Sequence, residues 1–490
     1  MCGIEQSQSD TMSARGAILT TVMWFRQDLR TRDNPALAAA AARGKVLPVY
    51  IFEEGRREAR PLGTAARWWL HQSLAALRAD LGELALFKGD PCDLLPMIIG
   101  RTGASAVYWT RCYEPHEDEL TRQLQARLHP LGAAARCFSG NLLHEPGDLL
   151  AKSGGPFKVF TPFWRACLAR RVAAPARRPR LDLVTTAAGG DRLADWRLPS
   201  AAGDRAAGWE KLWRPGEKGA LERLDEFLQN GLARYGERRD RPDVEGTSRL
   251  SPHLRWGEVS PRLIWLRLAR EREAASPPAG VAKFQSEIGW REFAYHLLFH
   301  FPTLPSQNWR DDFDAFPWRD DQGGLAAWQQ GRTGYPMVDA GMRELWHTGW
   351  MHNRVRMIVA SFLVKHLQID WRRGEAWFWD GLLDADLANN AAGWQWVAGS
   401  GADAAPFFRI FNPVAQGRKF DPQGDYVRRW CPELARLSDA RIHAPFEASA
   451  AELAEAGVVL GQTYPFPVID HARARQAALA AYARMRAARR

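Results

Sequence analysis

The sequence has few cysteines for its length and none of the spacings that build a structural framework. Its 490 residues include six cysteines, and no two of them form a Cys-x-x-Cys pair. This pattern excludes a disulfide scaffold and a zinc module of the usual spacing. His347 and His352 lack the His-Glu-x-x-His spacing, so no metal site is predicted. The thiols are expected to be incidental groups in a reducing cytoplasm.

Long apolar runs are also missing. No stretch reaches the roughly 18 apolar residues of a membrane-spanning helix, so no association with a membrane is expected. Residues 1–18 are polar and serine-rich and lack the hydrophobic centre of a signal peptide, which predicts a disordered extension. A cytoplasmic protein is therefore expected.

Tryptophan, in contrast, is abundant. The chain holds 22 Trp and only 9 Tyr, and 11 of the Trp lie between Trp290 and Trp396. Leu and Ile usually supply the bulk of a core, so this concentration of indoles predicts a stacking pocket, an electron path, or both. The formal net charge of +10 suits a polyanion such as DNA, although many basic proteins bind no nucleic acid.

Two kinds of pattern divide the chain. From Thr20 to about Asn141, short apolar runs alternate with helical segments, which predicts a parallel sheet with helices on both faces. No Gly-x-Gly-x-x-Gly follows the first strand, so the usual dinucleotide site is not predicted there. Residues 148–208 are rich in Pro, Gly, Ala and Arg, as in an interdomain linker, and helical patterns dominate after Trp209. We expect an α/β domain (19–147) with a five-stranded, Rossmann-like parallel sheet, the linker, and an all-helical domain (209–490).

The first motif of the helical part combines Tyr235 with the hydroxyl-rich stretch Thr247 to Pro261. Closely spaced hydroxyls and backbone amides at the start of a helix can bind phosphate. An ordinary Ser or Thr cap of a helix is the alternative.

The second motif places Glu287 and Trp290 three residues apart, which makes them neighbours on one face of a helix. A carboxylate beside an indole can bind the edge of an uncharged base while the indole stacks on it. An amphipathic helix with a surface ion pair is the alternative.

The third motif contains Asn353, Arg356 and Met357 on one helical face. An arginine at the start of an otherwise apolar helix requires a carboxylate or an electron-rich ligand. The fourth motif, from Trp379 to Pro413, contains Asp384 and Asp386 in a short polar run. Two acids this close indicate a cation or hydrogen bonds to ligand hydroxyl and ring N–H groups.

Taken together and in order, these motifs make the chain resemble the photolyase/cryptochrome family. The sequences WFRQDLRTRDNPAL, FTPFW, TSRLSPHL, TGYPMVDAGMREL, WMHNRVRM and DADLANNAAGWQW follow one another as they do in that family. The resemblance covers about Thr20 to Leu434. It implies FAD inside the helical domain and an antenna chromophore near the α/β domain.

The resemblance also implies roles for single residues, with Arg356 and Asp384 paired over the flavin ring and Asn390 facing its N5 atom. The residues implied to hold FAD are Tyr235, Thr247, Ser248, Leu250, Ser251, Trp290, Asn353, Arg356, Asp384, Asp386 and Asn390. Those implied to act in the pocket for a flipped-out lesion are Glu287, Trp290, Asn353, Met357, Asn390 and Trp396. Those implied to pass electrons inward to the flavin are Trp394, Trp371 and Trp318.

Single positions favour one branch of the family. Members that repair (6-4) photoproducts carry histidines in place of Asn353 and Met357, which cannot relay protons. DASH-type cryptochromes typically carry Tyr in place of Trp396, and plant cryptochromes carry Asp in place of Asn390. The resemblance therefore implies a monomeric enzyme, a deoxyribodipyrimidine photo-lyase, that acts on DNA containing cyclobutane pyrimidine dimers. A cryptochrome-type photoreceptor without repair activity is the alternative, and a helical DNA-binding protein that has lost its flavin is a third.

The antenna is expected to be 5,10-methenyltetrahydrofolate. The best-known folate-binding members carry a Cys-Lys pair where this chain has Pro305 and Ser306, so that lysine contact is missing. The stretch Asp384 to Pro413 instead resembles class III photolyases, which bind the same folate differently.

Overall fold

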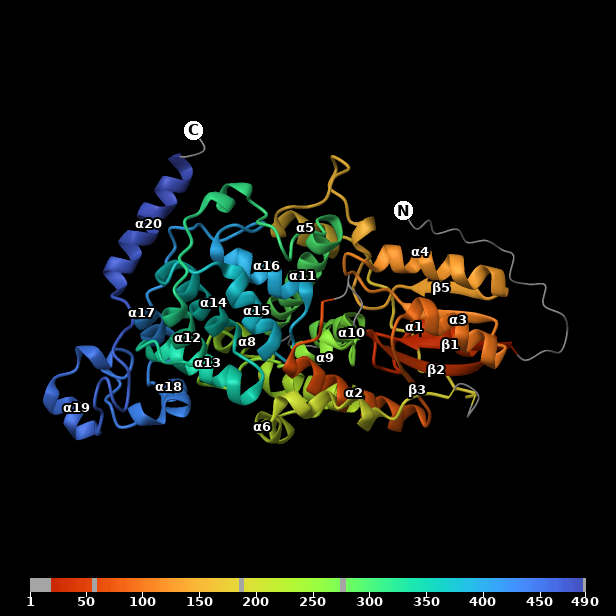
Figure 1. Ribbon diagram of the computed structural model, residues 1–490, viewed down its shortest axis with the longest axis horizontal. Helices are drawn as coiled ribbons and strands as arrows, with labels where there is room; N and C mark the ends of the chain where they lie inside the picture. Colours follow the sequence, from red (N-terminus) through yellow and green to blue (C-terminus); the bar gives the residue numbers. More distant parts are fainter. Residues whose placement is uncertain (1–18, 55–59, 185–188, 274–278, 488–490) are drawn as a thin grey trace.

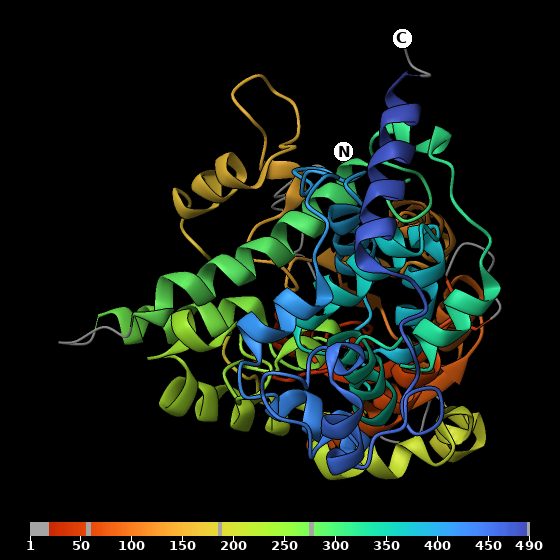
Figure 2. The same ribbon diagram turned by 90° about the vertical axis from the view of Figure 1, so that its left-hand side faces the viewer.

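The computed structural model describes residues 19–54, 60–184, 189–273 and 279–487, so the expected extension 1–18 lies outside the described residues. Figure 1 shows an α/β domain at one end of the molecule and a larger helical domain at the other. Figure 2 views the molecule from the helical end. Among the described helices, none combines the length and the apolar character that crossing a membrane would require.

The α/β domain is built on one parallel sheet of five strands in the order β3-β2-β1-β4-β5, which confirms the expected class of fold. Apolar residues fill these strands because both faces of a parallel sheet are covered by helices. In the central strand, Met23 and Phe25 enter one core and Val22 and Trp24 enter the other. The strands are β1 (Leu19–Phe25), β2 (Gly44–Phe52), β3 (Ala85–Lys88), β4 (Ala106–Thr110) and β5 (Ala134–Phe138). The helices between them are α1 (Pro35–Arg43), α2 (Thr64–Leu81), α3 (Pro91–Thr102) and α4 (Glu117–Leu128).

The helical domain starts after Trp213 and follows most of the expected periodic segments. Its helices are α7 (Glu217–Glu226), α8 (Tyr235–Arg238), α9 (Ser251–Arg255), α10 (Pro261–Arg272), α11 (Gly280–His300), α12 (Gln322–Gln329), α13 (Pro336–Thr348), α14 (Asn353–Ser361), α15 (Trp371–Gly381), α16 (Leu387–Ala398), α17 (Pro413–Phe420), α18 (Asp425–Trp430), α19 (Ala450–Ala456) and α20 (His471–Ala487). Its largest core lies among α12 to α18, and α20 stands along one side of it (Figures 1 and 2).

Residues 148–208, expected as a surface linker, contain helix α5 (Phe160–Leu168) and the first half of α6 (Arg205–Leu212), which continues into the expected helical domain. Phe163 of α5 is fully buried against α11, and Leu198 and Ala202 are buried in the core that α2 shares. The segment therefore supplies apolar side chains to cores at both of its ends. The high content of Pro, Gly and Arg obscured these short helices, since each buries only a few side chains.

The two domains are joined by buried polar groups from the loop that follows β1. The Asp33 carboxylate accepts hydrogen bonds from Arg262 (3.1 and 2.7 Å), from the Ser260 hydroxyl and from the backbone of Ala176 (2.8 Å). Asp33 and Arg262 have side-chain exposures of 1% and 8%, so this ion pair is shielded from water.

Arg30, three residues earlier in the same loop, makes a second set of buried contacts between the domains. Its guanidinium donates to the backbone carbonyls of Gly140 (2.8 Å) and Gly257 (2.8 Å) and to Asn141 Oδ1 (3.2 Å). Gly257 has φ +65°, and a Cβ atom there would lie 2.0 Å from the Gln27 carbonyl oxygen. Only glycine permits these two segments of the backbone to approach so closely at this point.

We expect Arg262→Ala to lower the free energy of unfolding by about 3–5 kcal/mol, because the Asp33 carboxylate would be left buried without its cation. Urea titration followed by circular dichroism measures the change. Arg270→Ala removes an exposed arginine from the same helix and serves as the control. Equal midpoints for the two variants would contradict a structural role for the buried pair.

Candidate functional site

The centre of the candidate site is an ion pair between α14 and the loop before α16. Arg356 Nη1 and Nη2 lie 3.1 and 2.8 Å from the two carboxylate oxygens of Asp384, and its Nε donates to the Met351 carbonyl (2.8 Å). Asp384 is 3% exposed and Arg356 is 24% exposed at the side chain. The structure thus brings together the two residues that the sequence predicted as a pair. Their charges are fixed in a bidentate geometry that a lysine could not reproduce.

The start of α14 is held by a buried network. His352 precedes the helix, and its Nδ1 accepts a hydrogen bond from the Arg354 amide (3.2 Å). Glu344 Oε2 accepts from the His352 amide (3.2 Å) and from the Tyr426 hydroxyl (2.7 Å). Burial raises the pKa of Glu344 to about 7 and lowers the pKa of His352 to about 3. This network positions the first turn of α14, which carries Asn353.

The start of α16 contains the second predicted acid. Asp386 caps the helix by accepting hydrogen bonds from the Asn389 amide (2.7 Å) and side chain (2.7 Å). Burial raises the pKa of Asp386, and the positive charges of Arg291 and Arg255 oppose this rise. Arg255 donates through Nε to the Ala385 carbonyl (2.7 Å), whereas its Nη1 is buried without a hydrogen-bond partner among the described residues.

Asn390 lies on the same helix, and its side chain is held by hydrogen bonds to Glu375. Its Nδ2 donates to the backbone carbonyl of Glu375 (3.1 Å) and to the carboxylate of Glu375 (2.7 Å). That carboxylate accepts two hydrogen bonds from Arg60 (2.6 and 2.8 Å), a residue of the α/β domain. The sequence did not predict a role for either Glu375 or Arg60.

Glu287 and Trp290 both lie on α11, three residues apart on one face of the helix, and both are half-buried. Trp290 stacks on Phe160 of α5, with ring centroids 3.8 Å apart and planes inclined by 7°. Glu287 forms an ion pair with Arg239, which follows α8 and is 13% exposed. Arg239 is a third residue that sequence reasoning missed, since 48 residues separate the two partners.

The predicted phosphate cradle lies where α9 begins. Thr247 and Ser248 are half-buried, and Ser251 is the exposed first residue of α9. The Ser248 hydroxyl accepts from the Leu250 amide (3.4 Å), and Trp350 Nε1 donates to the Ser251 hydroxyl (3.2 Å). Tyr235, at the start of α8, is buried between Phe227 and Phe284. Leu250 holds the N-cap position of α9, and no described side chain caps the helix, so the alternative of an ordinary Ser or Thr cap is not met. The binding of phosphate there stays a prediction.

The three predicted electron-transfer tryptophans share one core. Trp371 is fully buried, Trp394 is 3% exposed, and Trp318 packs against the cluster that contains both. The rings in contact with Trp394 among the described residues are those of Phe378 (5.0 Å) and Trp328 (6.1 Å). The order of electron transfer through them stays a prediction, as do the roles of Met357 on α14 and the half-buried Trp396 on α16.

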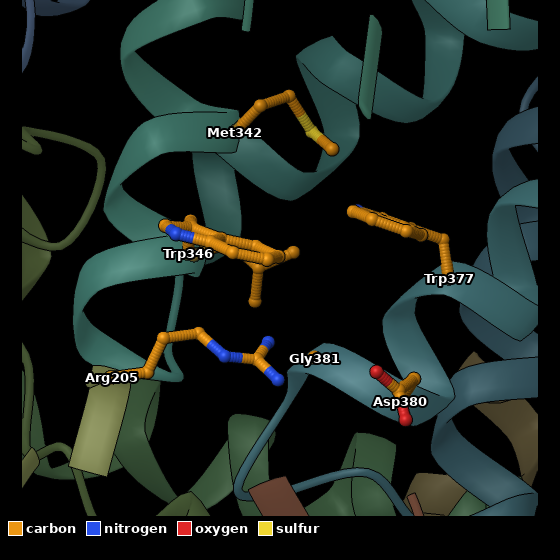
Figure 3. A pocket seen from close by; sticks show the side chains of 7 residues that line it. Arg205, Met342, Trp346, Trp377, Asp380 and Gly381 are labelled. Carbon is orange, nitrogen blue, oxygen red and sulfur yellow. The ribbon is translucent and has the colours of Figure 1, made fainter. Parts of the chain in front are cut away.

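Two hollows outside this site differ in what they could hold. Figure 3 shows the first, where Trp346 and Trp377 lie nearly parallel (9°) beside Arg205, whose guanidinium is 4.3 Å from the Trp346 ring. Its volume of about 10 Å³ is that of a single water molecule. The second hollow, of about 160 Å³, lies between the carboxyl end of β4 and α11 and includes Tyr113 and Phe299 in its lining.

The comparisons with known proteins agree with this architecture. Residues 21–180 match the family model "DNA photolyase", and residues 284–484 match "FAD binding domain of DNA photolyase". The chain is 53% identical over 470 residues to a deoxyribodipyrimidine photo-lyase from Agrobacterium fabrum, covering 94% of this chain and 97% of that one. The chain belongs to the photolyase/cryptochrome family.

Other members of the family are similar over nearly the same length. Cryptochrome-2 of Arabidopsis thaliana is 38% identical, with 96% of this chain and 79% of that protein covered. The crystal structure of a bacterial class III photolyase from Agrobacterium tumefaciens superposes with a TM-score of 0.92 at 52% identity, covering 98% of this chain and 99% of that one. The helical domain is therefore the FAD-binding domain of a photolyase-like protein.

The residues present fit FAD. The buried Arg255 Nη1 still has a hydrogen to donate, and Asp386 is a buried carboxyl that a ligand hydroxyl or ring N–H can satisfy. The Arg356–Asp384 pair adds a fixed positive and negative group beside them. Glu287, Trp290 and the site residues of α14 and α16 fall inside the matched FAD-binding model, whereas Tyr235 and residues 247–251 precede it.

We expect the Glu344→Gln variant to gain stability relative to the unchanged protein as the pH rises from 5 to 8. The folded state keeps the Glu344 proton up to a pKa of about 7, whereas the unfolded chain releases it near the ordinary value of 4.5. Stability therefore falls with rising pH across this window, by up to about 3 kcal/mol, and an uncharged glutamine avoids that loss. Urea unfolding at several pH values measures the difference.

The control for this series is Glu210→Gln, which replaces an exposed glutamate of α6. Its stability should differ from that of the unchanged protein by a constant amount at every pH. A parallel pH dependence of Glu344→Gln and Glu210→Gln would refute the buried, proton-holding state of Glu344.

Proposed function

We propose that this protein repairs cyclobutane pyrimidine dimers in DNA with the energy of blue or near-ultraviolet light. The observation that carries the proposal is the composition of α14. This helix presents Asn353 and Met357 beside the Arg356–Asp384 pair, and neither side chain can relay the protons that repair of (6-4) photoproducts requires. The 53% identity to a deoxyribodipyrimidine photo-lyase supports the same conclusion.

The dimer must leave the double helix to reach the site, because its bonds are inaccessible inside a duplex. A damaged, poorly stacked dinucleotide costs only a few kcal/mol to flip out, which favours the lesion over intact bases. Trp290 is fixed by Phe160 on one face, so its other face offers a rigid surface to a base, as Trp396 does from α16. Stacking on such rings contributes about 1–3 kcal/mol per base.

FAD would be held by the Arg356–Asp384 pair, Asp386 and Asn390, with Arg255 as an additional cation. Tyr235, Thr247, Ser248, Leu250 and Ser251 would hold its phosphates and ribitol. The chemistry that bound, reduced FAD supplies is the transfer of one electron to the dimer after light absorption, which opens the ring before the electron returns. Trp394, Trp371 and Trp318 would carry the electrons that bring the cofactor into its reduced form.

Glu287 has a separate task in this proposal. Its carboxyl group would hydrogen-bond one base of the dimer, and the Glu287–Arg239 ion pair would stabilise the negative charge that the base acquires, because the pair places a cation beside the base. Arg239 keeps this carboxylate in place through an ion pair at the pocket. Since each chain contains the complete set of these residues, a single copy suffices to act on dimer-containing DNA.

We also propose 5,10-methenyltetrahydrofolate as the antenna, in line with the similarity to a class III photolyase. The second hollow holds at most a part of this molecule, since its 160 Å³ is smaller than a typical ligand pocket of about 300–1,000 Å³. Denaturation of the purified protein should release a near-ultraviolet chromophore that FAD does not account for. Release of FAD alone would refute the folate.

The first prediction is light-dependent repair. The purified, reduced protein is mixed with an oligonucleotide that carries one thymine dimer, and recovery of the thymine absorbance is followed under blue or near-ultraviolet light. We expect recovery in the light and none in a dark control. If the protein binds FAD and is photoreduced but repairs nothing, the cryptochrome-type photoreceptor becomes the better description.

The second prediction concerns Glu287. Glu287→Ala should lower the repair yield per absorbed photon about tenfold, while the dissociation constant for dimer DNA should change less than about threefold, because the carboxyl acts on the charged dimer more than on its binding. Glu237→Ala, which removes an exposed glutamate of α8, is the control. Equal losses of yield and affinity would remove the proposed role.

A further inference from the structure

The orientation of the Asn390 amide is fixed by its partners. Both groups near Nδ2, the Glu375 carbonyl (3.1 Å) and the Glu375 carboxylate (2.7 Å), can only accept hydrogen bonds. The NH₂ group must therefore point toward Glu375, and Oδ1 must point away from it. An acceptor is thus presented on the side of Asn390 that faces away from α15 (Trp371–Gly381).

The acceptor that fixes this orientation is a buried charge. Glu375 is 5% exposed at the side chain, and its partner Arg60 is 30% exposed. Arg60 Nη1 and Nη2 lie 2.6 and 2.8 Å from the two carboxylate oxygens, so the contact is bidentate. Without this cation the Glu375 carboxylate would be left buried with two hydrogen bonds missing, which is costly, so its oxygens would turn toward other donors. The Asn390 amide would then lose the partner that orients it.

The loop that carries Arg60 is held by contacts that do not involve Arg60 or Glu375. It lies between β2 and α2 and packs on α15, where Trp379 Nε1 donates to the Pro61 carbonyl (2.8 Å). The Thr64 amide and hydroxyl each donate to Asp380 Oδ1 (2.9 Å). A Cβ atom at Gly63 would lie 2.1 Å from the Trp379 carbonyl oxygen, so the loop and the helix are in direct backbone contact. The loop should therefore keep its place when Arg60 is replaced.

We propose that Arg60, a residue of the α/β domain, is a positioning residue for the flavin site. Arg60 holds the Glu375 carboxylate in place as a hydrogen-bond acceptor. Glu375 binds the NH₂ group of Asn390 and thereby orients Asn390 Oδ1 toward the cofactor. This inference rests on the proposed function, in which Asn390 faces flavin N5. Reduced flavin carries a hydrogen on N5, whereas oxidised flavin has a lone pair there. A fixed acceptor beside N5 therefore favours the reduced cofactor, the form that repair requires.

The test is the rate at which the reduced cofactor is reoxidised by air in the dark, measured from the return of the visible flavin absorbance. Arg60→Gln should reoxidise about tenfold faster than the unchanged protein, the effect expected from one hydrogen bond. Arg60→Lys, which keeps the charge without the bidentate contact, should reoxidise about threefold faster. The ratio of FAD to protein is measured first, and should stay within about twofold.

Two further variants separate positioning from a simple loss of charge. Arg373→Gln removes an exposed arginine from α15, and should leave the rate within about twofold. In a Glu375→Gln background, Arg60→Gln should add less than about twofold, because the two side chains act through one contact. Equal reoxidation in Arg60→Gln and the unchanged protein, or a full tenfold effect in the Glu375→Gln background, would overturn the proposal. If Arg60→Gln binds no FAD, Arg60→Lys is compared in both backgrounds instead, with its expected threefold effect in place of the tenfold one.

The reoxidation assay needs no DNA, so its result does not depend on the repair assay. If the protein repairs no dimers but Arg60→Gln shows the tenfold effect, the role of Arg60 is supported and the proposed substrate is refuted. If the protein repairs dimers but reoxidation is unchanged in Arg60→Gln, the proposed function is supported and the role of Arg60 is refuted.

Discussion

The structure depends on the burial of charged groups from one loop of the α/β domain inside the helical domain. Arg30 and Asp33, which follow β1, are almost completely inaccessible to water and make their hydrogen bonds to residues far along the chain. Breaking one half of such a contact leaves a buried charge, which is far more costly than losing a surface ion pair. The relative position of the two domains is therefore fixed. As a result the loop with Arg60 reaches α15, and a residue of one domain can act on a site in the other.

Charged groups are also buried at the candidate site. Arg356 and Asp384 are satisfied by each other, whereas Asp386 and Arg255 retain hydrogen-bonding capacity in a buried environment. Groups left in this state favour a ligand that supplies the missing donors and acceptors. Glu287, the residue proposed to hydrogen-bond the dimer, is in turn held by its ion pair with Arg239. The site is thus rigid before any substrate arrives, which lowers the entropic cost of binding.

The abundance of tryptophan has a different explanation in each half of the molecule. In the α/β domain, Trp24, Trp68, Trp69 and Trp109 are fully buried parts of the two cores that cover the sheet. In the helical domain, Trp328 is also a core residue, whereas Trp290 and Trp396 stay half-buried. Core packing therefore explains the tryptophans of the α/β domain, whereas the stacking pocket and the electron path among those between Trp290 and Trp396 stay predictions. Only the partly exposed indoles offer a face to a base.

The sequence by itself determined the class of fold, the parallel sheet and the helical second domain, because apolar periodicity is a local property. The family resemblance of its short motifs implied the pairing of Arg356 with Asp384, which the structure contains. The sequence did not reveal that residues 217–238 form α7 and α8 with a short π-helix (Phe227–Gly231) between them, nor that the expected linker contains α5 and the first half of α6. Tertiary structure alone decided the partners of the site residues. Arg60 and Glu375 are 315 residues apart, and no local pattern records a contact between them. Such pairs form only when folding has brought two separate elements together and has excluded water from between them.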